Sequence, residues 1–207
     1  MLKQEYKRMT ASLSQRKATL RKKTLQQRDA LDESLRIEHS LLACEYGEKI
    51  SIFSPATFVP GTIVAGFHPI RSEIDPRPLM AYIGQLGGSL CLPIVLDKET
   101  IVFRELIRGA AMVECGFGTV GPDENAKVLN PDILLVPLSV FDRKGGRIGY
   151  GAGHYDRAIE RLEEMGKEPI LIGMAFGLQE TQDVPVEHHD QQLDGILTET
   201  DYIPVSC

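Results

Sequence analysis

Short apolar runs alternate with longer segments of helical periodicity along most of the chain. The apolar runs that predict strands lie at residues 50–53, 62–67, 89–95, 133–137 and 170–175, and a terminal strand is predicted at 195–198. Alternating strands and helices are typical of a βαβ architecture. We therefore predict an α/β fold that forms a single domain over residues 1–207, since this length is close to that of one domain.

One long amphipathic helix is predicted near the amino terminus by the apolar positions Leu13, Leu20, Leu31, Leu35 and Leu42. Ser12 and Gln15 have the spacing of a capping box at its start. A second helix, residues 76–86, begins at a proline and is closed by Gly87 and Gly88.

The clearest helical pattern begins at Gly153 or His154. Apolar side chains then recur at spacings of four and three, at Tyr155, Ile159 and Leu162. The helix is expected to stop at Gly166. It follows the predicted strand 133–137 through a glycine-rich turn, so the turn is expected at the carboxyl edge of the sheet, where open α/β sheets bind ligands.

Composition narrows the function classes. The apolar content of 43% is enough for a proper core, and the chain has no run of about 18 apolar residues, so no membrane partner is expected. A net charge of -6 argues against a protein that coats nucleic acid. The four cysteines have no metal-binding spacing and are expected to be free thiols in a reducing cytoplasm.

Positive charge is concentrated in the first 28 residues, where Glu5 is the only carboxylate. Such a segment is compatible with a solvated helix face, a targeting peptide or an arm that reaches an anionic ligand. Lys17 and Arg21 lie one helical turn apart on a single face and could supply two positive charges to a bound phosphate. Spacing alone leaves the solvated face as the ordinary alternative.

Five glycines fall within nine positions, at residues 145, 146, 149, 151 and 153. Such a backbone can turn its N–H groups inward as an anion nest at a helix amino terminus, whose dipole also favours negative charge. The pattern is neither a Walker sequence nor a dinucleotide fingerprint, and a flexible surface hairpin is the alternative. Arg147 lies within the turn and is the nearest cation for a phosphate.

Three carboxylates are candidates for the same site. Asp156 opens the helix just past the turn, either as a helix-start residue or as a Mg²⁺ ligand. Asp190 is a second candidate magnesium ligand. The neighbouring His188 and His189 are expected to be surface residues, because adjacent residues of an extended chain point in opposite directions. Glu73 follows a predicted strand, again at the carboxyl edge.

Four motifs occur in one order along the chain: Lys17-x-x-x-Arg21, Ser72-Glu-Ile-Asp75, the segment 136–156 with Arg147-Ile-Gly-x-Gly-x-Gly-His-Tyr-Asp156, and Pro185-Val-Glu-His-His-Asp190. Together they resemble the 5-formyltetrahydrofolate cyclo-ligase family, also called methenyltetrahydrofolate synthetases. The resemblance implies a three-layer α/β fold with a mostly parallel sheet and helices on both faces, like that of CoA transferases and ribose-phosphate isomerases. It also implies ATP and Mg²⁺ as cosubstrates in the cyclisation of 5-formyltetrahydrofolate to 5,10-methenyltetrahydrofolate, with ADP and phosphate as the other products.

The resemblance also implies roles for individual residues. Arg147 and Tyr155 are the implied catalytic residues, Asp156 and Asp190 the metal-linked carboxylates, and Glu73 the acid that holds the pteridine. The implied ATP-binding residues are Lys17, Arg21, Arg147, Ile148, Gly149, Tyr150, Gly151, Ala152, Gly153, His154 and Tyr155. The implied folate-binding residues are His68, Glu73, Tyr150, Gly151, Ala152, Gly153 and His154.

The sequence departs from the family pattern at two positions: His154 stands where tyrosine is common, and Tyr150 where arginine is common. These departures concern the finer substrate contacts, and the insertion-like stretch 54–61 leaves the entrance to the folate pocket undefined by the sequence. Two alternatives stay open. One is a relative that keeps the ATP loop but acts on another amide or pterin-like compound, and the other is a non-catalytic module that senses a phosphorylated metabolite. Reduced folate and ATP are the expected partners of a cytoplasmic monomer or weak homodimer.

Overall fold

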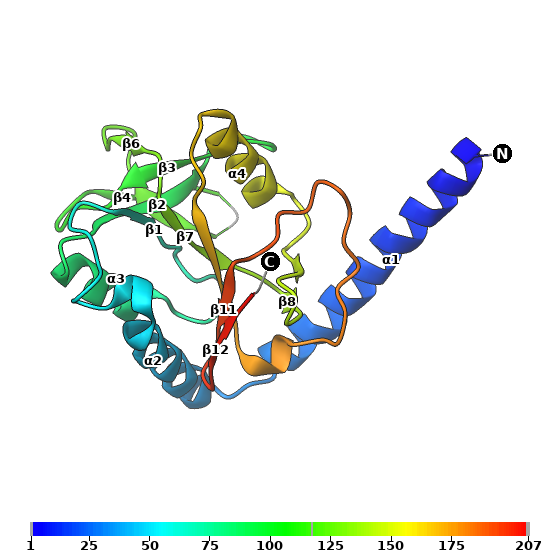
Figure 1. Ribbon diagram of the computed structural model, residues 1–207, viewed down its shortest axis with the longest axis horizontal. Coiled ribbons are helices and arrows are strands. Elements are labelled where there is room, and N and C mark those ends of the chain that lie inside the picture. The colour runs from blue at the N-terminus through cyan, green and yellow to red at the C-terminus, as the bar shows by residue number, and fades with distance from the viewer. Residues whose placement is uncertain (1, 117, 206–207) are drawn as a thin grey trace.

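The structure is a computed structural model that describes residues 2–116 and 118–205. A central sheet of eight strands divides the domain, with a long helix, α1 (Leu2–Asp29), extending away from the body (Figure 1). The strand order is β12-β11-β10-β7-β1-β2-β3-β6. Their bounds are β1 Ile63–Ala65, β2 Ser89–Val95, β3 Ile101–Glu105, β6 Val128–Leu129, β7 Ile133–Pro137, β10 Ile170–Met174, β11 Gly195–Leu197 and β12 Tyr202–Pro204.

The sheet is mixed. The five central strands, from β11 to β2, run parallel, whereas β12, β3 and β6 join antiparallel at the two edges. Two hairpins lie outside the main sheet: β4 (Met112–Glu114) with β5 (Val120–Pro122), and β8 (Val140–Phe141) with β9 (Arg147–Ile148). The predicted strands at 62–67, 89–95, 133–137, 170–175 and 195–198 are confirmed.

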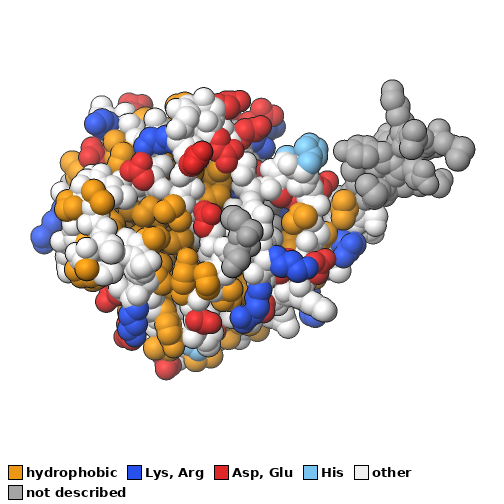
Figure 2. Space-filling view, in the orientation of Figure 1, with side chains coloured by type: hydrophobic (Ala, Val, Ile, Leu, Met, Phe, Trp, Pro, Cys, Tyr) orange, Lys and Arg blue, Asp and Glu red, His pale blue; other side chains and the backbone are white. Residues whose placement is uncertain are grey.

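Helices cover both faces of this sheet, as predicted. On one face α2 (Glu33–Lys49) and α3 (Arg77–Gln85) pack their apolar side chains on the strands. On the other face α4 (His154–Glu164) buries Ala158, Ile159 and Leu162. Its outer face carries exposed glutamates, and Figure 2 shows acidic side chains gathered over this helix. The result is a three-layer α/β domain.

Two sequence predictions about the amino-terminal half are wrong. The long helix is two helices, because the Asp32 carboxylate accepts a hydrogen bond from the Ser34 backbone N–H (2.8 Å) and begins α2 after a break at residues 30–32. A helix that already begins at Leu2 also leaves no capping role for Ser12 and Gln15.

Residues 50–53 form a 3₁₀ turn, η1 (Ser51–Phe53), rather than a strand. Phe53 is fully buried in the cluster beneath α2 and α3, so the apolar run reflects packing at a helix end. Short apolar runs cannot be assigned to strand or helix by periodicity alone. The predicted helix 76–86 is confirmed as α3, which is followed by Gly87 at a φ of 89°.

The cysteine prediction is confirmed for Cys44, Cys91 and Cys115, which are free and buried; Cys207 lies outside the described residues. Among the described residues, no helix is long and apolar enough to cross a membrane.

The strand order creates a crevice at the carboxyl edge. From β1 the chain passes through α3 to β2 on one side, whereas β7 pairs with β1 on the other side. Loops that leave β1 and β7 therefore diverge at this point, which is where open α/β sheets place their ligands. The stretch 54–61 lies before β1, at the opposite edge, and none of its residues lines the pocket described below.

Candidate active site

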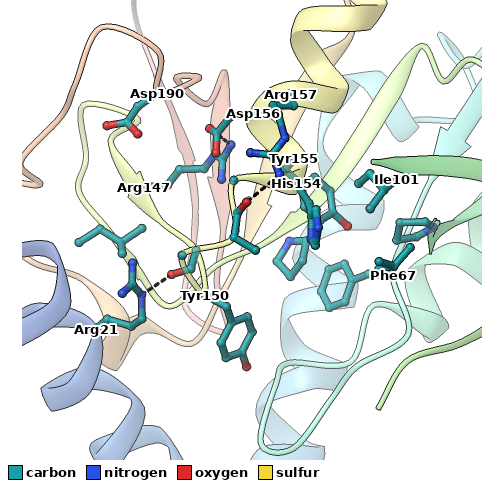
Figure 3. Close-up of a pocket in the computed structure, with 18 of the residues that line it drawn as sticks. Arg21, Phe67, Ile101, Arg147, Tyr150, His154, Tyr155, Asp156, Arg157 and Asp190 are labelled. Atoms are coloured by element: carbon teal, nitrogen blue, oxygen red, sulfur yellow. Dashed lines mark hydrogen bonds and ion pairs between the residues drawn. The ribbon is translucent and has the colours of Figure 1, made fainter. Parts of the chain in front are cut away.

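A cavity of about 780 Å³ opens at the carboxyl edge of the sheet. Its walls come from α1, the segment after β1, strands β2 and β3, the loop before α4 and residues 187–190. The sequence predictions for site residues converge here, since every candidate, including Ala152, lines this one cavity (Figure 3). A volume of this size accommodates a cofactor-sized ligand.

The glycine-rich segment has two parts with different tasks. Its first part is the tight β8–β9 hairpin, in which Arg143 and Lys144 are exposed and the other residues from 141 to 148 are buried, unlike a flexible surface hairpin. The buried Asp142 carboxylate accepts backbone hydrogen bonds from Lys144 (2.9 Å), Gly146 (3.0 Å) and Val184 (2.7 Å) and holds this hairpin in place. A Cβ at Gly145 would meet the Leu193 carbonyl oxygen at 2.6 Å, so only glycine fits there.

The second part, residues 149–153, is the loop that delivers the chain to the amino terminus of α4. Gly151 has a φ of 101°, and Gly153, at a φ of 67°, is the N-cap of α4 with no side-chain cap bond. The amino terminus of an eleven-residue helix, where backbone N–H groups lack partners within the helix itself, therefore lies at the cavity wall. This arrangement fits an anionic group such as a phosphate.

Arg147 projects from β9 toward this loop. Its side chain is only 5% exposed, and one terminal nitrogen lies 2.5 Å from Asp156 Oδ1 (Figure 3). The Arg147 Nε is buried and has no hydrogen-bond partner within the described part of the chain. A buried guanidinium group with an unpaired N–H is suited to an incoming phosphate oxygen.

Helix α1 brings its two predicted cations to the same cavity. Arg21 Nε donates to the Gly149 carbonyl oxygen at 2.6 Å, and burial lowers the pKa of Arg21 from its usual value. Lys17 Nζ lies 2.5 Å from Asp190 Oδ2 and 2.8 Å from Glu187 Oε2. For these two residues the solvated-face alternative is wrong.

Two opposing effects act on the Lys17 ammonium. Burial lowers the pKa of Lys17, but its hydrogen bonds and charge attraction to Asp190 and Glu187 outweigh burial, so the net shift is upward. Lys17 is therefore held as a cation at the rim of the cavity.

The carboxylates have separate positions. Ligand atoms of Glu187, His189 and Asp190 lie within 4.8 Å of one another, whereas Asp156 lies outside that group. Carboxylate oxygens suit Mg²⁺, although imidazole suits transition metals better. His188 and His189 are exposed, as predicted, but the stated reason is wrong: they lie in a turn, with ring centroids 5.1 Å apart.

The far end of the cavity is built around Glu73. Its Oε2 accepts the Ile70 backbone N–H at 2.9 Å. Burial raises the pKa of Glu73, and the Ile70 hydrogen bond, the Arg28 charge and the Tyr150 hydroxyl only partly offset that rise. A desolvated carboxylate in a cavity is a strong acceptor for paired N–H donors.

Two further polar atoms in this part of the cavity have no hydrogen-bond partner among the described residues. They are the buried Tyr155 hydroxyl and the buried His68 Nδ1. Burial raises the pKa of Tyr155, and Glu73 adds to the rise, so this hydroxyl is a neutral donor. Both atoms are buried side-chain groups of residues that line the cavity.

Sequence reasoning missed Arg28 and Glu187. Arg28 is 1% exposed and donates to the Tyr150 hydroxyl at 2.6 Å. Its position seven residues after Arg21 places both on one face of α1, which is the signal that could have identified it. Glu187 shares Lys17 with Asp190, and no spacing pattern predicted that pair.

The loop geometry leads to a first prediction, that Gly151→Ala raises the KM for the ATP that the sequence resemblance implies. A Cβ there would meet the Arg21 guanidinium at 3.2–3.3 Å, and a φ of 101° is strained for any L side chain. Strain of about 1–3 kcal/mol shifts the loop away from Arg21. Steady-state kinetics provide the measurement. Gly149→Ala is the matched variant and should be far milder, because its φ is not positive and its Cβ would lie 4.0 Å from the nearest atom.

Comparison with known proteins gives a consistent result. A family model described as the 5-formyltetrahydrofolate cyclo-ligase family matches residues 13–199. The 5-formyltetrahydrofolate cyclo-ligase of Haemophilus influenzae is 30% identical over 140 residues, which cover 65% of this chain and 74% of the relative. That of Mycolicibacterium smegmatis is 27% identical over 192 residues, covering 88% and 93%.

A solved structure agrees in fold and sequence. The 5,10-methenyltetrahydrofolate synthetase of Aquifex aeolicus superposes with a TM-score of 0.77 at 28% identity, covering 92% of this chain and 93% of that protein. Because the family match spans nearly all of the fold and includes every residue that lines the cavity, this chain is a ligase that belongs to the 5-formyltetrahydrofolate cyclo-ligase family.

Proposed function

We propose that this protein uses ATP and Mg²⁺ to cyclise 5-formyltetrahydrofolate to 5,10-methenyltetrahydrofolate, releasing ADP and phosphate. The observation that carries the proposal is one cavity with two chemically different ends. One end holds the cations Lys17, Arg21 and Arg147 beside the glycine loop, and the other holds the desolvated carboxylate of Glu73. ATP carries a polyphosphate that cations bind, whereas a pterin presents ring N–H groups that a carboxylate accepts.

The cationic end supports phosphoryl transfer. The formyl oxygen of the folate attacks the γ-phosphorus, the bond to the β-phosphate oxygen breaks, and ADP leaves. Arg147, Lys17 and the N–H groups of α4 are the groups that would neutralise charge on the transferred phosphoryl group. Micromolar binding of ATP requires about 8 kcal/mol, whereas a helix terminus contributes only about 0.3–2 kcal/mol, so the cations are needed.

For ring closure the protein mainly has to align the two reacting groups of the folate. A formamide carbon is a poor electrophile, and phosphorylation of its oxygen creates a leaving group. N10 then attacks the formyl carbon, phosphate departs with the oxygen, and the N10 proton is lost to give the methenyl product. Alignment of two reacting groups lowers such barriers strongly. No covalent nucleophile from the protein is required.

Glu73 is the group proposed to fix the pteridine, by accepting paired hydrogen bonds from ring N–H groups. The unpartnered Tyr155 hydroxyl and His68 Nδ1 are placed to complete the contacts around the substrate. We assign Tyr155, with Arg147, to the reacting groups, since the charges of both Glu73 and Arg147 act on the Tyr155 hydroxyl (Figure 3).

Magnesium would supply charge neutralisation and orientation to the ATP phosphates. The carboxylate oxygens of Asp190 and Asp156, which flank the cationic end, fit this role chemically, and Glu187 adds a third carboxylate. Lys17 forms ion pairs with both Asp190 and Glu187, so its single charge offsets part of the repulsion between these two acids.

The proposal is tested by ADP release. Purified protein with Mg-ATP should form ADP only when 5-formyltetrahydrofolate is present, with one ADP for each folate consumed. ADP formation with an unrelated formamide but not with this folate would instead favour a relative with another substrate. Nucleotide binding with no ADP formation under any condition would favour a non-catalytic sensor.

A further inference from the structure

Arg28 is a fully buried cation outside the substrate cavity. It lies in the last turn of α1, is 1% exposed, and is not among the cavity's lining residues. Burial of a guanidinium group is strongly unfavourable unless its N–H groups are paired with good geometry. The identity of its partners therefore indicates its task.

The partners of Arg28 come from two separate segments. Its Nε donates to the Ser72 hydroxyl at 3.1 Å, and a terminal nitrogen donates to the Tyr150 hydroxyl at 2.6 Å. The guanidinium carbon also lies 5.9 Å from the centre of the Tyr150 ring. The Ser72 hydroxyl in turn donates a hydrogen bond to Asp29, so Ser72 is bound to α1 through both Arg28 and Asp29.

Tyr150 links this contact to Glu73. Its hydroxyl accepts from Arg28, and the other Arg28 partner, Ser72, directly precedes Glu73 in the chain. Tyr150 follows Gly149, whose carbonyl accepts from Arg21. The same short loop therefore contacts the cationic end through its backbone and the Glu73 end through one side chain.

We propose that Arg28 and Tyr150 couple the two ends of the cavity, so that nucleotide and folate bind cooperatively. Arg28 acts as a positioning residue: it joins the Tyr150 hydroxyl to Ser72, the residue before Glu73, and thereby orders loop 149–153 at the phosphate end. A ligand that engages Glu73 fixes the neighbouring Ser72 and, through Arg28, Tyr150 and its loop, so the nucleotide then meets an ordered site. Thermodynamic linkage requires the reciprocal effect. The inference rests on the proposed function for the identity of both ligands.

Titration calorimetry with a non-hydrolysable ATP analogue and Mg²⁺ tests the coupling directly. In the unmodified protein, saturating 5-formyltetrahydrofolate should tighten analogue binding by about 5-fold or more, the lower bound typical of coupled sites. In Tyr150→Phe, which removes only the hydroxyl, the enhancement should fall to less than about 2-fold. Tyr46→Phe is the matched control, because both tyrosines are 37% exposed and Tyr46 lies on α2 away from the cavity.

Arg28→Lys provides a second variant, since a lysine keeps the charge but loses the planar fork that reaches two partners. A thermal melt checks that it folds, and it should lose the enhancement as Tyr150→Phe does. Retention of the full enhancement in Tyr150→Phe would overturn the coupling. Binding of both ligands to the unmodified protein without enhancement would overturn it while leaving the proposed function intact. Binding of neither ligand would overturn both.

Discussion

Replacement of Arg147 by alanine is expected to lower kcat/KM for ATP by about 10²–10³-fold, the usual effect of losing one preorganised donor to developing charge. Arg147 is 5% exposed, its Nε has no partner among the described residues, and it borders both the glycine loop and α4. The substitution also leaves the Asp156 carboxylate without its cationic partner, and this unpaired negative charge repels phosphate. Steady-state kinetics with ATP as the varied substrate measure the effect.

The matched control lies four residues earlier in the same hairpin. Arg143 is 61% exposed and pairs with Glu180 on the surface, so Arg143→Ala should change kcat/KM for ATP by less than about 2-fold, since exposed pairs contribute little. Similar losses for Arg143→Ala and Arg147→Ala would contradict a specific phosphate role for Arg147. They would point instead to damage of the hairpin itself.

The Glu73→Gln variant is expected to raise the KM for 5-formyltetrahydrofolate by about 10–100-fold, because hydrogen bonds to a charged acceptor contribute about 1.5–3 kcal/mol. Glutamine keeps the size of the side chain but offers only one carbonyl acceptor. The KM for ATP should change much less, apart from the coupling through Tyr150. Glu45→Gln on the exposed face of α2 is the control. Equal increases in both KM values would contradict the assignment of Glu73 to the folate end.

A pH profile tests the same residue without a large structural change. Burial raises the pKa of Glu73 above the ordinary glutamate value, despite its hydrogen bond from Ile70 and the nearby Arg28 charge. The ionised form accepts ring N–H groups, so the folate KM should increase as the pH falls through this raised pKa. The inflection should lie above about 4.3, the value for a free glutamate. It should be absent in Glu73→Gln, and it should be much smaller in the KM for ATP of the unmodified protein, which Glu73 affects only through the coupling.

Sequence spacing predicted the glycine loop and its helix because both features are local. Closely spaced glycines before an amphipathic helix indicate a backbone with positive φ, and the structure has positive φ at Gly145, Gly151 and Gly153. Lys17 and Arg21 were also predictable, since a spacing of four places them on one helix face. What spacing could not decide was whether that face meets solvent or the cavity.

Interactions between distant segments were not predictable from the sequence. Arg28 resembles any basic residue of a solvated helix, and only the fold places Ser72 and Tyr150 around it. The pairing of Lys17 with Glu187 joins residues 170 positions apart. The chain also forms a turn at residues 188–189, where an extended segment was expected from the sequence. The finer likeness to CoA transferases, the cytoplasmic location and the oligomeric state stay predictions.

The most direct test of the central claim is the near-ultraviolet absorbance of the methenyl product. Purified protein is mixed with 5-formyltetrahydrofolate and Mg-ATP, beside a control without ATP. We expect an ATP-dependent rise that is strongly reduced in Arg147→Ala and restored toward normal by high folate in Glu73→Gln. A flat trace from folded protein that binds ATP would contradict the proposed reaction.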